Sequence, residues 1–128
     1  MRILRYSLSV ILSLFAFSWV SAQSIEGTWE IRMPDDEGNE RIAHFTAKEG
    51  SYQLDFNADG EIEVTGKYEL ADGQMTIWDT GGDPKVMCPG EAKGVYAVTI
   101  TDAELTMKMI SDECEGRGSI GVITMTRK

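Results

Sequence analysis

Hydrophobic and polar residues alternate in short runs along most of the chain after residue 23. The run "GTWEIRM" (Gly27–Met33) places Trp29, Ile31 and Met33 on one face. A spacing of two is the period of a half-buried β-strand, whereas an amphipathic helix needs apolar residues three and four positions apart. Helical spacing does not persist over a dozen positions anywhere after residue 23. The pattern therefore predicts an all-β protein.

Turns rich in Gly, Asp and Pro divide the alternating sequence into eight predicted strands. These are Gly27–Met33, Arg41–Ala47, Ser51–Phe56, Glu61–Leu70, Gln74–Asp79, Gly94–Ile100, Glu104–Ile110 and Ser119–Thr126. Most connections are tight turns, which make neighbouring strands antiparallel. Eight sequential antiparallel strands in so short a chain predict a closed up-and-down β-barrel, because closure leaves no unpaired edge. A β-sandwich is the alternative, although its Greek-key topology needs longer crossings than this chain offers.

The stretch "DFNADGEIEV" (Asp55–Val64) resembles the start of an EF-hand calcium loop. An EF-hand closes its ligand cage with a Glu at the position that Gly66 occupies here, and it joins two helices. Both flanks alternate with the strand period instead, which predicts a β-hairpin with a tight turn at Asn57–Gly60. Weak calcium binding by the turn from Asp55 to Glu63 stays open. After the turn, the residues expected on the inward face are Ile62, Val64, Tyr68 and Leu70.

Residues 1–22 have the organisation of a secretory signal peptide. Arg2 and Arg5 form a basic start, an apolar run follows, and Val20–Ala22 provides a small-residue cleavage site. The apolar run is short for a membrane span, and no second such run follows it. We expect residues 23–128 to form one small domain that is exported to a periplasm or to the extracellular medium, without a membrane span.

The chain is acidic, with a formal net charge of −9. Because Arg2 and Arg5 lie in the predicted leader, the mature charge becomes −9 − 2 = −11. Phosphates would be repelled, which argues against nucleic acid or an anionic membrane surface as a partner. We expect most of the acidic residues on a solvated outer surface.

The mature chain contains two cysteines, Cys88 and Cys114. Two thiols in one small exported domain usually pair, and closing a loop of about 26 residues stabilises by roughly 3 kcal/mol. A redox pair and a thiolate metal site are the alternatives. The first usually has C-x-x-C spacing and the second needs three or four clustered ligands. The sequence favours a structural disulfide.

No catalytic constellation is visible in the sequence. The only histidine, His44, falls on the second predicted strand, and no Cys or elbow-like Ser provides a nucleophile for it. We therefore expect no enzyme, no metal and no cofactor. Thioether clusters suit Cu(I), but Leu105, Met107 and Met109 alternate as a barrel interior would. Core packing is the favoured interpretation of the methionines.

The predicted inward face is rich in aromatic and apolar side chains. The candidates for lining the barrel or contacting a ligand are Trp29, Tyr52, Leu54, Phe56, Tyr68, Tyr96, Leu105 and Met107. Beside Cys114, Asp112 and Arg117 carry opposite charges. We expect them to pair and to order the loop beside the disulfide. The alternative is that Arg117 receives a ligand carboxylate at the barrel mouth.

Two further signatures resemble a known family. The motif Gly27–Trp29 opens the first strand and Arg127 ends the last, and "LDFNADGEIEVTGKYELADGQMTI" (Leu54–Ile77) forms a hairpin-turn-hairpin. Together with the blocks "CPGEAKGVYAV" and "DECEGR", they resemble the bacterial lipocalin-like proteins, small secreted relatives of the calycin group. The resemblance covers residues 27–127 and implies that Trp29 and Arg127 form a pair that closes the barrel bottom.

The resemblance implies an exported barrel that binds or sequesters a small apolar ligand. The chain is shorter than a typical lipocalin, and its loops offer little material for a lid over the mouth. A small barrel of eight strands is filled by its own side chains in some proteins, so a hollow and a filled interior both stay open. The alternative function is an envelope protein-interaction module or an inhibitor with a filled core.

Overall fold

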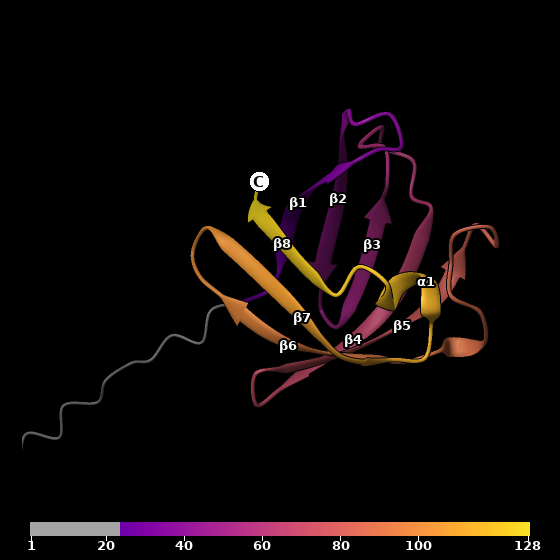
Figure 1. Ribbon diagram of the computed structural model, residues 1–128. Helices are drawn as coiled ribbons and strands as arrows, with labels where there is room; N and C mark the ends of the chain where they lie inside the picture. Colours follow the sequence, from indigo (N-terminus) through magenta and orange to yellow (C-terminus); the bar gives the residue numbers. More distant parts are fainter. Residues whose placement is uncertain (1–23) are drawn as a thin grey trace, which may run out of the picture.

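The computed structural model describes residues 24–128, which form a closed antiparallel barrel (Figure 1). Its eight strands are β1 (Gly27–Pro34), β2 (Glu40–Lys48), β3 (Ser51–Asp55), β4 (Val64–Ala71), β5 (Gln74–Gly82), β6 (Gly94–Ile100), β7 (Glu104–Asp112) and β8 (Val122–Arg127). Each strand pairs with the next, and β8 pairs back with β1, where Ile31 lies opposite Met125. The predicted up-and-down barrel is confirmed, and the sandwich is wrong. The predicted signal peptide lies outside the described residues.

Two hairpin turns show how the local sequence sets the strand order. At the turn from β2 to β3, Glu49 and Gly50 have φ angles of 51° and 81°. At the turn from β4 to β5, Asp72 and Gly73 have φ angles of 53° and 74°. Positive φ at both central residues is the geometry of a type I′ turn, whose twist matches that of the flanking strands. Each turn therefore returns the chain directly alongside itself.

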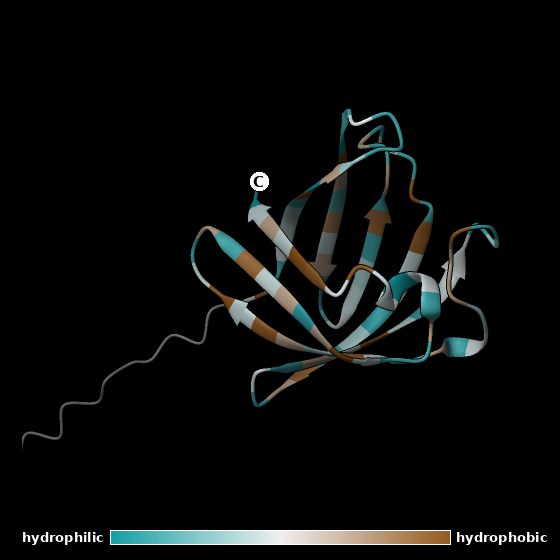
Figure 2. Ribbon diagram, viewed as in Figure 1, coloured by the Kyte–Doolittle hydropathy of each residue, from teal (hydrophilic) through white to brown (hydrophobic). Residues whose placement is uncertain are grey.

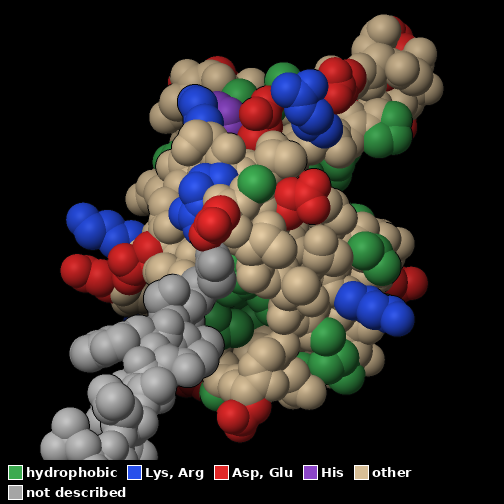
Figure 3. Space-filling model, turned by 90° about the vertical axis from the view of Figure 1, so that its left-hand side faces the viewer, with side chains coloured by type: hydrophobic (Ala, Val, Ile, Leu, Met, Phe, Trp, Pro, Cys, Tyr) green, Lys and Arg blue, Asp and Glu red, His purple; other side chains and the backbone are tan. Residues whose placement is uncertain are grey.

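Apolar and polar residues alternate along the strands, as the colours of Figure 2 show. The buried core includes Trp29, Ile31, Phe45, Tyr52, Val64, Met75, Ile77, Tyr96, Leu105, Met107 and Met125. These residues come from strands throughout the barrel, so the core forms only when the barrel closes. Charged side chains of both signs are scattered over the face shown in Figure 3, with hydrophobic side chains between them.

Trp29 and Arg127 close one end of the barrel. The guanidinium of Arg127 lies 4.1 Å from the centre of the Trp29 ring. The Trp29 indole is fully buried, and its Nε1–H donates to the carbonyl of Ile25 at 2.7 Å. Arg127 also donates to the carbonyls of Ser24, Glu26 and Asp102. These bonds join the first described residues to the last strand and to the turn between β6 and β7.

Three residues expected on the inward face are more exposed than a core position would be. Ile62 is 43% exposed because it lies in the connection before β4, which begins at Val64 and not at Glu61. Leu70, near the end of β4, is 39% exposed. Met109 is 37% exposed and lies beside a register irregularity between β6 and β7. Leu70 lies opposite the buried Met75 and Met109 opposite the buried Tyr96, so both are on the predicted face of their strands, where the core does not cover them fully. The inward prediction was wrong for Ile62.

Helical structure in residues 24–128 amounts to two single turns. These are the 3₁₀ turn η1 (Pro89–Glu91) and the α-helical turn α1 (Glu115–Gly118). Because α1 occupies the connection after β7, the last strand begins at Val122 and not at Ser119 as predicted. No helix within the described residues is long and apolar enough to cross a membrane.

Candidate functional site

The barrel encloses a cavity of about 370 Å³ at the end opposite Trp29. Its inner wall comes from the strands, and the loop between β5 and β6 and the segment around α1 form its mouth. The lining residues are Ile31, Met33, Phe45, Tyr52, Leu54, Phe56, Val64, Ile77, Asp79, Lys85, Val86, Met87, Cys88, Tyr96, Met107, Cys114, Gly116, Arg117, Ile120, Ile123 and Met125. Most of these side chains are apolar, so the cavity suits an apolar occupant.

Position along each strand decides which of the predicted lining residues reach the cavity. Five of them do: Tyr52, Leu54, Phe56, Tyr96 and Met107. Trp29, Tyr68 and Leu105 do not line the cavity. Trp29 and Leu105 lie near the starts of β1 and β7, at the closed end, where they are fully buried. Tyr68 lies towards the end of β4, where it is partly buried against the core.

Asp79 is the first of two buried carboxylates beside the cavity. It lies near the end of β5 and is only 5% exposed. The hydroxyl of Tyr52 donates to its Oδ1, and the backbone N–H of Cys88 donates to its Oδ2 at 2.7 Å. Both carboxylate oxygens therefore have donors, as a buried carboxylate requires.

Asp112, at the end of β7, is the second buried carboxylate, and its side chain is 0% exposed. Arg117 of α1 donates to it twice, from Nε to Oδ2 at 2.8 Å and from Nη2 to Oδ1 at 2.9 Å. The hydroxyl of Tyr96 donates to Oδ2, and the N–H of Cys114 donates to Oδ1 at 2.8 Å. The charge pair expected from the sequence is confirmed, and it orders the loop beside the disulfide.

Arg117 also connects the two carboxylates. Its Nη1 lies 3.6 Å from Oδ1 of Asp79, too far for a hydrogen bond. Nη1 is buried and has no hydrogen-bond acceptor within the described part of the chain. We call Tyr52, Asp79, Tyr96, Asp112 and Arg117 the Arg117 cluster. Of these residues, four line the cavity directly, and Asp112 lies behind Arg117 and Tyr96.

Burial and mutual hydrogen bonding set the protonation of the Arg117 cluster. Burial raises the pKa of the Tyr52 and Tyr96 hydroxyls, and the carboxylates that they contact raise it further. Both phenols therefore act as donors at neutral pH. Burial alone would raise the pKa of Asp112, but the bonds from Arg117 and Tyr96 outweigh it and hold this pKa below its usual value. Asp112 is thus a carboxylate at neutral pH.

Cys88 and Cys114 form a disulfide, as predicted, with Cα atoms 5.9 Å apart. It joins the loop before η1 to the segment before α1, and both half-cystines line the cavity. Their backbone N–H groups are also the ones that donate to Asp79 and Asp112. The disulfide and the Arg117 cluster therefore hold the same two segments of the mouth together.

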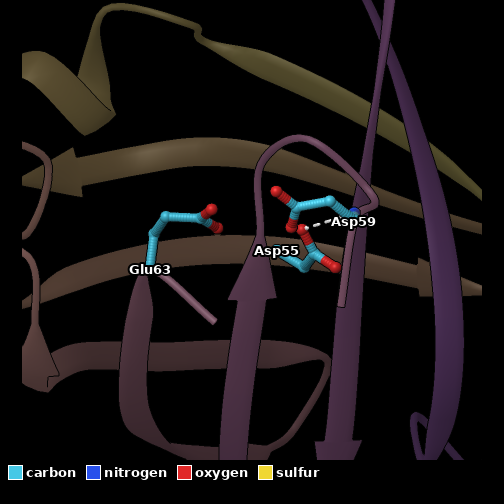
Figure 4. Close-up of side chains that lie close together, drawn as sticks. All are labelled: Asp55, Asp59 and Glu63. Atoms are coloured by element: carbon cyan, nitrogen blue, oxygen red, sulfur yellow. Dashed lines mark hydrogen bonds between the residues drawn. The ribbon is translucent and has the colours of Figure 1, made fainter. Parts of the chain in front are cut away.

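The turn that resembles a calcium loop brings three carboxylates together (Figure 4). Oxygens of Asp55, Asp59 and Glu63 lie within 4.8 Å of one another. Asp55 Oδ1 accepts N–H bonds from Asn57 and Asp59, and Oδ2 accepts one from Gly60 at 2.7 Å.

Glu63 accepts from the N–H of Phe56 at 2.7 Å. Burial alone would raise the pKa of Asp55, but the donors from Gly60 and Asp59 lower it overall. The carboxylates of Asp55 and Glu63 therefore close the connection between β3 and β4, which is longer than the predicted tight turn.

His44 lies on the second strand, as predicted, whereas Asp79 does not lie on the outer surface where acidic residues were expected. His44 is half-buried on β2 and is not among the cavity-lining residues. Asp79 was missed because acidic residues were expected on the outer face. It continues the inward alternation of Met75 and Ile77 along β5, and that alternation was the signal that could have found it.

Comparison of the chain with protein-family models, with curated proteins and with solved structures gives no match.

Proposed function

We propose that this protein is an exported lipocalin-like barrel that binds or sequesters a small apolar molecule in the cavity. The observation that supports this most directly is an interior space of about 370 Å³ with a mainly apolar lining. Ligand pockets usually measure about 300–1,000 Å³ and combine an apolar wall with a few placed polar groups. The cavity lies in the lower part of that range, and the Arg117 cluster provides the polar groups.

Four methionines in the lining make the cavity adaptable. Met33, Met87, Met107 and Met125 come from β1, from the loop after β5, from β7 and from β8. Unbranched thioether side chains adopt several rotamers at low energy and fill irregular gaps. We expect the cavity to accept a range of apolar shapes.

The proposed location outside the cytoplasm rests on two features. The sequence of residues 1–22 has the pattern of a secretory leader. The two cysteines form a disulfide, which persists mainly in oxidising compartments. A periplasmic or extracellular site of action agrees with both.

A protein-interaction module is the second candidate, and exposed apolar residues favour it. Val86, Ile110, Ile120 and Val122 are each about half exposed. Two of them, Val86 and Ile120, also line the cavity, so the same residues suit the entrance for an apolar ligand.

A titration with N-phenylnaphthylamine, an uncharged fluorescent probe, tests the proposal. We expect saturable binding to the disulfide-bonded protein and displacement by small apolar molecules. Ile123→Phe adds volume to a cavity-lining residue and should weaken probe binding. Ile62→Phe is the matched control, since Ile62 is exposed and lies outside the lining, and it should leave binding unchanged.

Native mass spectrometry of protein purified from its own source provides an independent test, because a carrier should retain a small molecule. Absence of probe binding, together with a ligand-free mass in every preparation, would overturn the proposal in favour of a protein-interaction module.

A further inference from the structure

We infer that the cavity selects uncharged apolar ligands, such as esters, over carboxylates of the same chain length. This inference rests on the proposed function and names the class of ligand. It follows from the charges and donors of the Arg117 cluster.

The formal charges of the Arg117 cluster do not balance. Asp79 and Asp112 each carry a negative charge, and Arg117 carries the only positive charge among the five residues. Asp79 is 5% exposed, and the side chains of Asp112 and Arg117 are 0% and 14% exposed. Water therefore screens these charges poorly, and the inner wall carries one uncompensated negative charge. A ligand carboxylate beside this wall would bury a second uncompensated negative charge.

The donors of the same residues are already used. The hydroxyls of Tyr52 and Tyr96 donate to carboxylates, as do the N–H groups of Cys88 and Cys114. Arg117 donates from Nε and Nη2 to Asp112 and Ala92, and its Nη1 is buried 3.6 Å from Oδ1 of Asp79. A ligand carboxylate would therefore gain no hydrogen bond from the cluster to offset the cost of burying its charge.

Lys85 is the other cation in the lining, and it does not reverse this preference. It is exposed at the mouth, where water and salt screen its charge. The surrounding domain is strongly acidic. The whole chain has a formal charge of −9 even with Arg2 and Arg5 of the predicted leader counted, so the domain without them is more acidic still. That field disfavours the approach of anions.

Competition between matched ligands tests the inference on the disulfide-bonded wild-type protein. Methyl laurate and laurate share an alkyl chain and differ in charge. Each displaces N-phenylnaphthylamine in a separate titration at neutral pH. We expect methyl laurate to displace the probe at a concentration roughly tenfold lower than laurate.

Asp79→Asn tests whether the excess charge causes the selection. The amide oxygen can still accept from the N–H of Cys88, and the amide NH2 can donate to the hydroxyl oxygen of Tyr52, which rotates to accept. The substitution removes the uncompensated negative charge, so the preference for ester over acid should shrink several-fold, mainly through tighter laurate binding. Asp72→Asn is the matched control. Asp72 is exposed at the turn between β4 and β5, outside the lining, and the preference should stay as in the wild type.

Laurate binding to the wild type as tightly as methyl laurate would overturn the inference while leaving the proposed function intact. An equal preference in the Asp79→Asn and Asp72→Asn variants would also overturn it. The wild-type comparison decides the matter if the Asp79→Asn variant does not fold. Absence of binding by the probe and by every ligand would instead reject the proposed function, and the inference with it.

Discussion

Arg117 of α1 and Asp112 at the end of β7 form a two-point ion pair, with N–O distances of 2.8 and 2.9 Å. Nη2 of Arg117 also donates to the carbonyl of Ala92, just before β6, at 2.8 Å. One side chain therefore fixes the segment after β7 against the segment before β6. The cavity mouth keeps its shape because these contacts join its two sides.

Replacing Arg117 with Met should destabilise the protein, because it leaves the carboxylate of Asp112 buried without its cation. Removing one partner of a buried pair costs about 3 kcal/mol. The free energy of unfolding from urea titration measures the change. Arg32→Met is the control, since Arg32 pairs with Glu30 and Glu40 on the exposed surface, where such pairs contribute less than about 1 kcal/mol. Equal losses in the two variants would contradict the assigned role of Arg117.

Acid should destabilise the protein in a pH window set partly by Asp112. Its pKa is lower in the folded than in the unfolded state, so its contribution to stability is fully present above the ordinary Asp value of about 3.9 and is lost as pH falls through the folded pKa. Urea midpoints measured from about pH 6 to about pH 2 should fall steeply in this window.

The Asp112→Asn variant should be less stable than the wild type at neutral pH and should lose less stability on acidification. Asp72→Asn, at an exposed turn, should keep the wild-type slope. Parallel curves for wild type and Asp112→Asn would show that Asp112 does not contribute to acid sensitivity.

Removing the disulfide should weaken both stability and ligand binding. The bond closes a loop with a sequence separation of 26, so the double variant Cys88→Ser, Cys114→Ser should lose roughly 3 kcal/mol. Because both half-cystines line the cavity, probe affinity should fall as well. Calorimetry and probe titration measure the two effects. Full affinity in a stable double variant would mean that the Arg117 cluster alone maintains the mouth.

Gly66→Ala should strongly destabilise the barrel. A Cβ at Gly66 would overlap the Tyr52 ring and lie 2.6 Å from the carbonyl oxygen of Trp78. Tyr52 is 2% exposed and bonded to Asp79, so it has little room to move, and we expect a loss of about 3 kcal/mol. Gly116→Ala is the control, because a Cβ there meets no atom within 4 Å. Thermal unfolding of the two variants makes the comparison.

Several features could be predicted from the chain alone because their causes are local. β6 has the predicted bounds, Gly94–Ile100, since an alternating run lies between turn residues. The pairing of Cys88 with Cys114 is predictable because the chain has only two cysteines. The inward positions of Tyr52 and Met107 followed from alternation.

Asp112 shows why alternation fails at the candidate site. Counting in twos from Leu105 along β7 places Asp112 outside. In the barrel, Val95 pairs with Ser111 and Tyr96 pairs with Met109, so Ile110 has no partner and the alternation shifts by one residue. The Asp112 side chain therefore lies inside, where Tyr96 and Arg117 bond to it. Such a shift depends on the partner strand, which no local pattern describes.

The sequence by itself determined the strand period, the antiparallel order and the positions available for a disulfide, because each depends on neighbouring residues or on a simple choice of partners. Only the tertiary structure decided that the interior keeps a cavity, that its wall carries Asp79, and that Arg117 lies between two carboxylates. The volume of the cavity is the volume that the closed barrel encloses minus the volume of the side chains that point into it. Its polar wall depends on contacts between residues far apart in the chain, such as Tyr52 and Asp79, which only closure of the barrel brings together.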